Sequence, residues 1–324
     1  MALRNSAPQY VGTADQAAEA VTGLVLDIKE KLEAECGLRP TEVVVGGSIG
    51  HRTALPWKFD ADIVIYSEDI VAEEVEKSGY DRWLGKIHHF MQKDQDISEC
   101  YQLQNITAHG LQFIYEGVDM NLLLSPHWTR PGDYFKYLSS ISPSLRFRFS
   151  ASAAKWQVQF FKQQSSQSKD LCCDLIKRAK AWRDHTWPRG SGGTGRPSSY
   201  LVSLLVAKAF ENSQKKMGLF STMYPDTLAL KTTEELKYML LNHKTIDVYW
   251  EHYYSLSQYQ SMVPSSVPRV IDPANPSNNL YDTGIGYYCA NEKSSDFEQG
   301  DGDWTAFKKK IHTADLTKPI EHWL

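Results

Sequence analysis

Two aspartates separated by one alanine, Asp60 and Asp62, directly precede the apolar, β-branched run IVIY that ends at Tyr66. Such a run is typical of a buried strand, and side chains at positions i and i+2 of a strand project from the same face. The two carboxylates would therefore converge, and they would repel each other unless a bound cation kept both ionised. The pair favours folds in which a strand presents adjacent acids to a metal.

A third acid lies in a predicted hairpin. Residues 111–115 form another apolar run, Glu116-Gly117 forms a turn, and residues 118–123 return as a strand that carries Asp119 among apolar neighbours. If this strand is adjacent to the first, Asp119 completes a cluster of three carboxylates. Two Mg²⁺ ions about 3.5–4 Å apart, held by such a cluster, are what phosphoryl and nucleotidyl transfer require.

The alternative interpretation of an Asp-x-Asp pair is a solvated surface pair, which is the commoner case for the motif alone. Asp94-Gln-Asp96 and Asp301-Gly-Asp303 match the same pattern, and we interpret both as exposed turns. Asp60 and Asp62 differ from them because an apolar strand follows at once and a glycine turn precedes.

That turn is Gly46-Gly47-Ser48, which follows the short β-branched run 42–45. Glycines let backbone N–H groups approach phosphate oxygens, and Ser48 adds a hydroxyl donor. A strand, a glycine turn and a helix start would form an anion-binding nest here. Gly-Gly-Ser alone is a weak signal, but together with the acids it predicts a site for a metal and a triphosphate, with Gly47 and Ser48 at the phosphates.

Lysines in the segment LIKRAKAW, residues 175–182, offer further phosphate contacts. Lys177 and Lys180 are three residues apart, so they share one face of a helix. A solvated basic stripe is the simpler interpretation of the segment by itself. With a metal–triphosphate site in the first half of the chain, contact with nucleotide phosphates across a cleft is favoured.

Periodicity divides the chain into two halves. Residues 14–36 and 75–92 have helical spacing and alternate with the strands, so the first half mixes both structures. Helical spacing recurs at 170–185, 198–212, 233–241 and 246–259, and strand-like runs become scarce. Residues 264–303 are rich in Pro, Asn and Gly, which predicts a long ordered loop.

Composition excludes several classes of protein. The net charge of −4 provides no global positive field for nucleic acid or an acidic membrane. Five cysteines without a CxxC pair argue against a disulfide framework and a zinc site, and fit a reduced compartment. The N-terminus lacks the apolar core of a signal peptide, and no apolar run approaches the roughly 20 residues of a membrane span. We expect a soluble, cytoplasmic protein without membrane contact.

The stretch GGSIGHRTAL, followed by Asp60-Ala-Asp62, resembles the signature of the nucleotidyltransferase superfamily, which includes poly(A) polymerases, cyclic GMP-AMP synthase and the 2′-5′-oligoadenylate synthetases. The segments LIKRAKAW, IDVYWEHYY, PRVIDPANPSNNL and PIEHWL resemble stretches of 2′-5′-oligoadenylate synthetases in order and spacing. The resemblance covers nearly the whole chain. It implies an α+β, two-lobed nucleotidyltransferase fold. Residues 1–160 would be the catalytic lobe with a mixed β-sheet and helices, and residues 161–324 a helical C-terminal lobe whose last residues can pack back on the first.

The resemblance also implies roles for the acids and for two lysines. Asp60, Asp62 and Asp119 would hold two catalytic Mg²⁺ ions, and Asp119 would help to activate the attacking hydroxyl. Lys177 falls where the family usually has Arg, and Lys180 where the family has its phosphate-binding Lys. The positive charge is kept at Lys177, but the bidentate geometry of a guanidinium is lost.

The resemblance implies the substrates as well. Ser199-Tyr200 falls on a Gln-Tyr pair of the family, so Tyr200 would stack on or hydrogen-bond the donor nucleotide, and the change to Ser199 affects base specificity. The implied reaction transfers AMP from ATP to the 2′-hydroxyl of a second ATP or a growing oligomer, with release of pyrophosphate, in an innate immune role. Alternatives are a cyclic-dinucleotide synthase and a catalytically silent nucleic-acid sensor; the three intact acids disfavour the sensor.

Two family traits are altered. Many relatives are activated by double-stranded RNA, which requires several Lys or Arg contacts. Here Val45 stands where vertebrate members often carry Lys, the predicted loop 163–169 is mostly uncharged, and the first helix mixes basic and acidic residues. We expect weak, altered or absent activation by RNA. Ala306-Phe307-Lys308 replaces a Cys-Phe-Lys that some relatives use for oligomerisation, so we expect a monomer.

Overall fold

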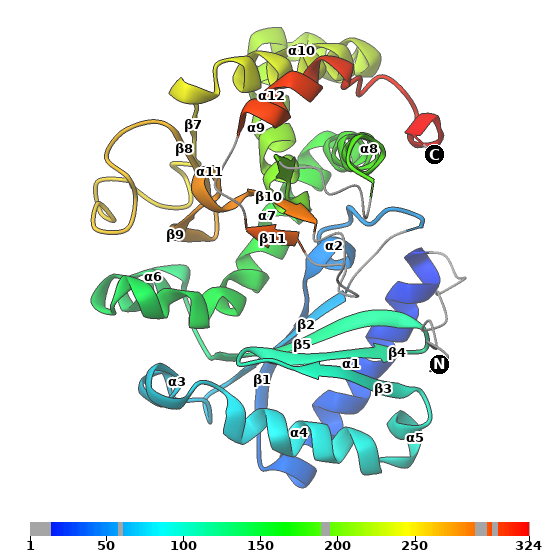
Figure 1. Ribbon diagram of the computed structural model, residues 1–324, viewed down its shortest axis with the longest axis vertical. Coiled ribbons are helices and arrows are strands. Elements are labelled where there is room, and N and C mark those ends of the chain that lie inside the picture. Colours follow the sequence, from blue (N-terminus) through cyan, green and yellow to red (C-terminus); the bar gives the residue numbers. More distant parts are fainter. Residues whose placement is uncertain (1–13, 58–60, 189–194, 289–296, 300–303, 324) are drawn as a thin grey trace, which may run out of the picture. The chain divides into compact units, whose positions relative to one another are not determined.

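The computed structural model describes residues 14–57, 61–188, 195–288, 297–299 and 304–323 (Figure 1). The chain divides into two compact units, Met1–Gln159 and Phe160–Leu324. The boundary falls inside helix α7 (Ala154–Ser168), whose first residues belong to the first unit.

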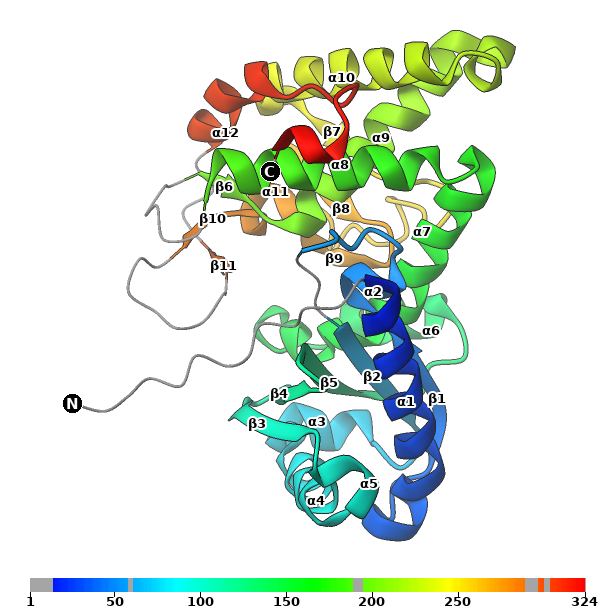
Figure 2. The same ribbon diagram turned by 90° about the vertical axis from the view of Figure 1, so that its right-hand side faces the viewer.

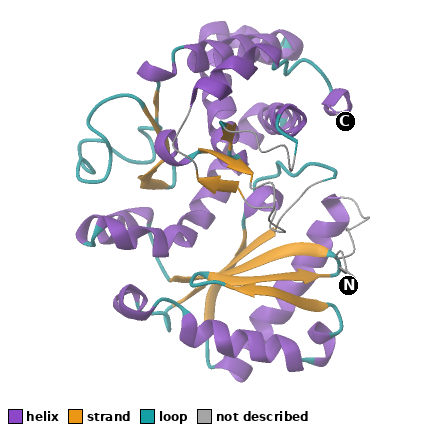
Figure 3. Cartoon of the chain, in the orientation of Figure 1, coloured by secondary structure: helices purple, strands orange, loops and turns teal. Residues whose placement is uncertain are grey.

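The first unit contains a five-stranded mixed sheet in the order β1-β2-β5-β4-β3 (Figure 3). Only the central pair, β2 and β5, is parallel; the other neighbours are antiparallel. The bounds are β1 (Pro40–Val45), β2 (Ala61–Ser67), β3 (Tyr101–Ile106), β4 (Gly110–Tyr115) and β5 (Val118–Pro126). The mixed sheet confirms the α+β class predicted from the sequence.

The inner strand β2 is buried on both faces, which explains its continuous apolar run. Ile63 and Ile65 point to one face and Val64 and Tyr66 to the other, and all four are fully buried. Helix α1 (Ala14–Cys36) contacts β1, and helix α4 (Asp81–Lys93) contacts β3 and β4. The predicted helix 14–36 is therefore confirmed as a core-facing helix.

The other helices of this unit are short. They are α2 (Gly47–Gly50), α3 (Ala72–Ser78), α5 (Gln95–Ser98), α6 (Pro131–Ser140) and the 3₁₀ segment η1 (Pro143–Ala153). The helix predicted for residues 75–92 is confirmed as helical structure but is divided into two helices, because α3 ends at Ser78, before Gly79 with its φ of +66°, and α4 begins at Asp81.

Two other predictions in this unit have different outcomes. The hairpin β4–β5 is confirmed, and its turn residues Glu116 and Gly117 have φ values of +49° and +81°, as a two-residue turn requires. The prediction of an exposed turn at Asp94-Gln-Asp96 is wrong for Asp94. Its carboxylate caps α5 by accepting hydrogen bonds from the amides of Asp96 and Ile97, and its side chain is 13 % exposed.

The second unit is mainly helical (Figure 2). It contains α8 (Leu171–Thr186), α9 (Ser199–Met217), α10 (Pro225–Leu241) and the short helices α11 (Leu280–Thr283) and α12 (Trp304–Lys310). Its 3₁₀ segments are η2 (Gly218–Thr222), η3 (His243–Thr245), η4 (Ile311–Thr313) and η5 (Ile320–Trp323). Large buried side chains such as Trp182, Phe210 and Trp250 fill the core, and η5 contacts α8 within the same unit.

Small sheets in the second unit correct the expectation that strands are scarce there. One sheet has the order β7-β8-β9 and the other the order β11-β10-β6. Their bounds are β6 (Arg196–Pro197), β7 (Asp247–Val248), β8 (Arg269–Asp272), β9 (Asn275–Asn279), β10 (Ile285–Tyr288) and β11 (Phe297–Gln299). Most of these strands lie in the segment 264–303 that was predicted to be a loop, although residues 301–303, with the predicted Asp301-Gly-Asp303 turn, lie outside the described residues.

Two further predictions in this half are wrong. Residues 246–259 form β7 and a series of turns rather than a helix, because Val248 reaches the core from β7, and Trp250 and Tyr254 reach it from irregular backbone. Residues 163–168, predicted to be a loop, are the last turns of α7. Among the described helices, none combines the length and the apolar character needed to cross a membrane.

Candidate active site

Two aspartates from adjacent strands lie on one face of the first unit's sheet. Asp62 on β2 is paired with Asn121 on the parallel strand β5. Side chains alternate along a strand, so Asp119, two residues before Asn121, projects from the same face as Asn121 and Asp62. Asp62 is half-buried and Asp119 is exposed, so the carboxylates lie at an accessible part of the sheet.

Asn121 holds the carboxylate of Asp62. Its side-chain amide donates a hydrogen bond of 3.0 Å to Oδ1 of Asp62. Asn121 was not predicted from the sequence as a site residue. Its signal was present, because Asp119 and Asn121 repeat the i, i+2 spacing of the acid pair on the neighbouring strand.

Asp60, the remaining acid of the predicted cluster, lies outside the described residues. Within the parts of the chain that the structure describes, no group of three or more His, Cys, Asp or Glu residues is arranged to hold a metal ion. Asp62 and Asp119 contribute two carboxylates, and carboxylate oxygens are the ligands that Mg²⁺ takes in proteins. The carboxylates of Asp62 and Asp119 are therefore of the ligand type that binds Mg²⁺.

The glycine turn between β1 and α2 is pressed against Asp62. The amide of Gly46 donates a hydrogen bond of 2.6 Å to the backbone carbonyl of Asp62. Gly47 has a φ of +60°, and a Cβ at this position would lie 2.9 Å from Oδ2 of Asp62. Only glycine meets both conditions without strain. Oδ1 of Asp62 is thus held by Asn121, while Oδ2 faces Gly47.

Ser48 is the second residue of α2, a single turn closed by hydrogen bonds from the amides of Gly50 and His51 to the carbonyls of Gly46 and Gly47. Ser48 is half-buried. The strand, glycine turn and helix start predicted from the sequence are present in this order, directly beside Asp62.

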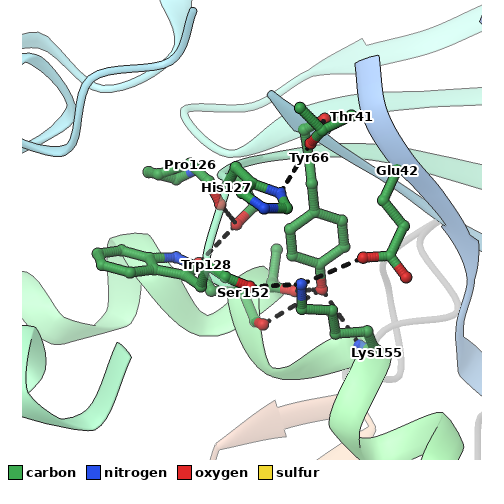
Figure 4. A network of polar contacts seen from close by, with 10 residues as sticks. Thr41, Glu42, Tyr66, Pro126, His127, Trp128, Ser152 and Lys155 are labelled. Carbon is green, nitrogen blue, oxygen red and sulfur yellow. Dashed lines mark hydrogen bonds and ion pairs between the residues drawn. The ribbon is translucent and has the colours of Figure 1, made fainter. Parts of the chain in front are cut away.

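A buried polar network closes the other end of the same sheet face (Figure 4). Tyr66, four residues after Asp62, accepts a hydrogen bond from the Lys155 amide over 3.1 Å. The Lys155 ammonium lies 4.7 Å from the Tyr66 ring centre and donates to Glu42 Oε2 and to the Trp128 carbonyl. Burial raises the pKa of Tyr66, so its hydroxyl stays neutral. The network attaches the start of α7 to the sheet, which leaves Asp62 at the accessible end of this face.

The predicted phosphate-binding lysines lie on α8 in the second unit. Lys177 is partly exposed, and its ammonium lies 3.6 Å from Asp174. Lys180 is 5 % exposed and belongs to the buried side of the helix. Lys180 is therefore not part of a solvated basic stripe, which was the simpler interpretation of the segment.

Ser199 and Tyr200 form the first turn of α9, which Ser198 caps by accepting a hydrogen bond from the Leu201 amide. Ser199 Oγ accepts a hydrogen bond from Nη1 of Arg183. The Tyr200 hydroxyl donates a 3.0 Å hydrogen bond to Oδ1 of Asp272, which is fully buried. Neither Arg183 nor Asp272 was predicted from the sequence as a site residue. The segment PRVIDPANPSNNL, which contains Asp272, carried the family resemblance and was the available signal.

The buried carboxylate of Asp272 accepts hydrogen bonds from several donors. Besides the Tyr200 hydroxyl, Oδ1 accepts a hydrogen bond of 2.8 Å from the Ala274 amide, and the Asn278 amide approaches Oδ2 at 3.4 Å. A buried carboxylate with several donors fixes its neighbours. Tyr200 is therefore held at the start of α9 by the second unit's own core.

Sequence comparisons identify related proteins. A family model described as 2′-5′-oligoadenylate synthetase 1, domain 2, C-terminus, matches residues 129–296, just over half of the chain. The chain is 22 % identical to mouse 2′-5′-oligoadenylate synthase 1A over 279 residues, 75 % of this chain and 70 % of that protein. It is 23 % identical to the rat protein of the same name over 271 residues, 75 % of this chain and 72 % of that protein.

Structural comparison identifies the same fold in a bacterial protein. The chain is similar to CdnC of E. coli MS115-1 in complex with HORMA-deltaN, with a TM-score of 0.56, 16 % identity, and coverage of 94 % of this chain and 84 % of that one. CdnC solved with ATP gives a TM-score of 0.56 with 16 % identity, covering 92 % of this chain and 83 % of that one. The fold, the family model and the relatives agree, and the chain is a nucleotidyltransferase enzyme that belongs to the 2′-5′-oligoadenylate synthetase family.

Proposed function

We propose that this enzyme transfers AMP from ATP to the 2′-hydroxyl of an adenylate acceptor and releases pyrophosphate. The observation that carries the proposal is the shared sheet face of Asp62 and Asp119, with the glycine turn against the Asp62 carboxylate. Membership of the oligoadenylate synthetase family supports the choice of reaction. CdnC, which has the same fold, was solved with ATP, and this supports ATP as a substrate.

Asp60, Asp62 and Asp119 would hold two Mg²⁺ ions. When bound, these ions would polarise the α-phosphate and neutralise the leaving pyrophosphate. The protein's own contribution is to fix the ligands, because Asn121 and Gly47 leave the Asp62 carboxylate little freedom to rotate. The Asp119 carboxylate, exposed on the same face, would also accept the proton of the attacking 2′-hydroxyl.

The donor triphosphate would contact the backbone amides at Gly47 and Ser48, because the first N–H groups of a helix have no acceptor within the helix. Lys177 and Lys180 would neutralise its phosphates. Tyr200 would stack on the donor nucleotide through its ring, since its hydroxyl already binds Asp272.

The second candidate function is that of a cyclic-dinucleotide synthase, which would accept a second base beside adenine. Ser199 favours this candidate. Its short side chain accepts a hydrogen bond from Arg183, and it stands where other members of the family have a glutamine. A serine cannot present both a donor and an acceptor at the same distance as glutamine. Acceptance of GTP beside ATP is therefore compatible with this site.

Activation by double-stranded RNA is expected to be weak or absent. On α1, the Lys31 ammonium lies 2.8 Å from Asp94 and 2.7 Å from Asp96, so its charge is already paired within the protein. RNA binding depends on cations that can replace the counterions of phosphates. A lysine with two carboxylate partners contributes little to such a surface.

One experiment tests the proposed reaction. Purified protein is incubated with Mg²⁺ and ATP, or ATP with GTP, with and without long duplex RNA, and the products are digested with a nuclease specific for 3′-5′ bonds. We expect a linear series of adenylates that resists the nuclease and forms without RNA. A single cyclic product would select the second candidate, and products that the nuclease degrades completely would contradict the 2′ linkage.

A further inference from the structure

A hollow of about 700 Å³ lies in the first unit, between the first half of α1 and the turn that joins β4 to β5. We call it the acidic hollow, because three of its described lining residues are acids and none is basic. Its lining includes Glu19, Gly23 and Asp27 of α1, Tyr115 at the end of β4, and Glu116 in the turn. None of the described residues of the candidate active site lines it.

The lining residues of α1 are spaced along one side of the helix. Glu19, Gly23 and Asp27 follow each other at intervals of four residues, so they form a stripe on one face. The Cα atoms of Glu19 and Asp27 are about 12 Å apart, because each helical residue rises about 1.5 Å. A Cβ at Gly23 would have no described neighbour within 4 Å beyond its own helix backbone. The glycine therefore keeps the hollow open at a position where a helix would favour alanine.

The three carboxylates of the acidic hollow have no ion pair or hydrogen bond with any residue that the structure describes. Lys31 would be the ordinary partner of Asp27, which lies four residues before it on the helix. The ammonium of Lys31 is instead held by Asp94 at 2.8 Å and by Asp96 at 2.7 Å. The hollow therefore carries a net negative charge, which attracts cations.

Tyr115 independently indicates a ligand. It is 6 % exposed, and its hydroxyl has no hydrogen-bond partner among the described residues. The hydroxyl is not one of the fully enclosed unpaired atoms in these parts of the chain, so it opens into the hollow that Tyr115 lines. Burial, followed by negative groups that include Glu116 and Asp27, raises the pKa of Tyr115 to about 12. The neutral hydroxyl can thus accept a hydrogen bond from a bound cation.

The spacing of the acids favours an extended organic cation over a metal ion. A divalent metal ion needs all its oxygen ligands within about 2.0–2.6 Å. No group of three or more acidic, His or Cys residues in the described ranges is arranged in this way. Ala20 and Leu24 line the hollow between the acids, and aliphatic chains pack on such apolar surface while their charged groups stay near water. Ammonium groups joined by methylene chains match this alternation.

We propose that the acidic hollow binds a linear aliphatic polyamine. Its terminal ammonium groups would pair with the carboxylates of Glu19 and Asp27, whose separation is similar to the length of an extended triamine. Its methylene groups would lie over the apolar floor between them. Glu116 and the Tyr115 hydroxyl would accept hydrogen bonds from its amine groups, and such charge-assisted bonds are stronger than neutral ones. The proposed reaction uses none of these residues.

The test is isothermal titration calorimetry of the full chain with spermidine, in 0.05 M NaCl without nucleotide or Mg²⁺. We expect saturable binding at one site, and at least tenfold weaker binding in 0.5 M NaCl, because salt screens exposed ion pairs. The shorter 1,3-diaminopropane should bind at least tenfold more weakly than spermidine, because it cannot bridge Glu19 and Asp27. Asp27→Asn combined with Glu116→Gln should also weaken spermidine binding at least tenfold.

Substitutions at Gly23 provide a comparison that does not remove any charge. Gly23→Leu places a side chain in the hollow and suits a helix better than glycine, so it should prevent spermidine binding without lowering the melting temperature. Gly23→Ala adds only one methyl group and should weaken binding less. The control is Glu33→Gln, because Glu33 is an exposed acid of α1 that does not line the hollow, and its loss should leave the affinity unchanged.

Three results would overturn the proposal. They are no binding of spermidine to the wild type up to about 1 mM, a Gly23→Leu or acid-to-amide double variant that binds like the wild type, and equal affinities for spermidine and 1,3-diaminopropane. The last result would indicate unspecific attraction of cations. If the double variant does not fold, Gly23→Leu decides the question alone. The outcome is independent of the proposed reaction, because no substrate is present.

Discussion

The side-chain amide of Asn121 donates a 3.0 Å hydrogen bond to Oδ1 of Asp62 across the parallel strands β2 and β5. Partners that orient metal ligands typically affect metal affinity or activity by about 10–100-fold. Asn121→Leu removes the donor at nearly constant volume. We therefore expect kcat to fall by about 10–100-fold and half-maximal activity to require more Mg²⁺, measured as the initial rate against Mg²⁺ concentration.

The matched control for this variant is Asn105→Leu. Asn105 is exposed on the edge strand β3, and its side-chain amide donates a 3.4 Å hydrogen bond to the side chain of Gln112. This control should retain the wild-type rate and Mg²⁺ response. A Mg²⁺ response that is the same in Asn121→Leu and the wild type would contradict a positioning role for Asn121.

The two glycines of the turn, Gly46 and Gly47, should respond differently to substitution by alanine. A Cβ at Gly47 would lie 2.9 Å from Oδ2 of Asp62, and its φ of +60° is unfavourable for alanine by roughly 1–2 kcal/mol. At Gly46 the nearest atom would be 3.5 Å away and φ is −99°. We expect Gly47→Ala to lose at least about tenfold in kcat and Gly46→Ala much less. Equal losses in the two variants, measured as initial rates, would show that the turn does not act through Asp62.

Two substitutions at Tyr200 distinguish the role of its hydroxyl from the role of its ring. Tyr200→Phe removes a hydrogen bond to the buried Asp272 and should lower the free energy of unfolding by about 1–3 kcal/mol, with little change in KM for ATP. Tyr200→Leu removes the ring and should also raise KM for ATP. Thermal melts and ATP titrations check both. An unchanged KM in Tyr200→Leu would remove Tyr200 from the nucleotide site.

Asp94 gives a prediction for pH. Burial opposes its ionisation, but hydrogen bonds from the Lys31 ammonium and from the Ile97 and Asp96 amides outweigh burial and lower the pKa of the carboxyl. A lowered folded-state pKa contributes stability that is present above the unfolded value, about 3.9, and is lost as pH falls through the folded value. Asp94→Ala, which also removes the helix cap, should cost about 1–2 kcal/mol at pH 7.

Asp94→Asn keeps a capping side chain and removes only the charge, so it isolates the pairing with Lys31. The difference in free energy of unfolding between this variant and the wild type should stay constant from pH 7 to about pH 5 and shrink below about pH 4. Denaturant unfolding at several pH values measures it. A difference that shrinks between pH 7 and pH 5 would assign the effect to another group.

Local patterns predicted the parts of the fold where one residue type dominates. The strand β2 was predictable because both of its faces are buried, and the β4–β5 hairpin because Glu116-Gly117 suits a tight turn. The strand β3 was missed because five of its six residues are exposed and its alternation of apolar and polar residues ends after Gln104. Residues 246–259 have the spacing of a helix although they form none, because strand β7 directs Val248 into the core and the irregular backbone after it directs Trp250 and Tyr254 there.

The residues of the candidate site could be predicted from the sequence, but the contacts between them could not. The acids and the glycine turn could be named from the sequence because their chemistry is restrictive. The hydrogen bond from Asn121 to Asp62 depends on the register of β2 against β5, and the constraint on Gly47 depends on how closely the turn approaches Oδ2. The pairing of Tyr200 with Asp272 joins positions 72 residues apart. Such contacts depend on tertiary structure that local patterns do not encode.

Asp119→Asn tests whether the carboxylates on this face of the sheet are required for nucleotidyl transfer. Asp119 is exposed, so the substitution should leave the melting temperature within about 2 °C of the wild type. The measurement is pyrophosphate release from ATP in the presence of Mg²⁺. We expect steady release by the wild type and at least about a hundredfold slower release by the folded variant, because one metal-binding carboxylate is lost. A folded Asp119→Asn protein that releases pyrophosphate at the wild-type rate would contradict this requirement.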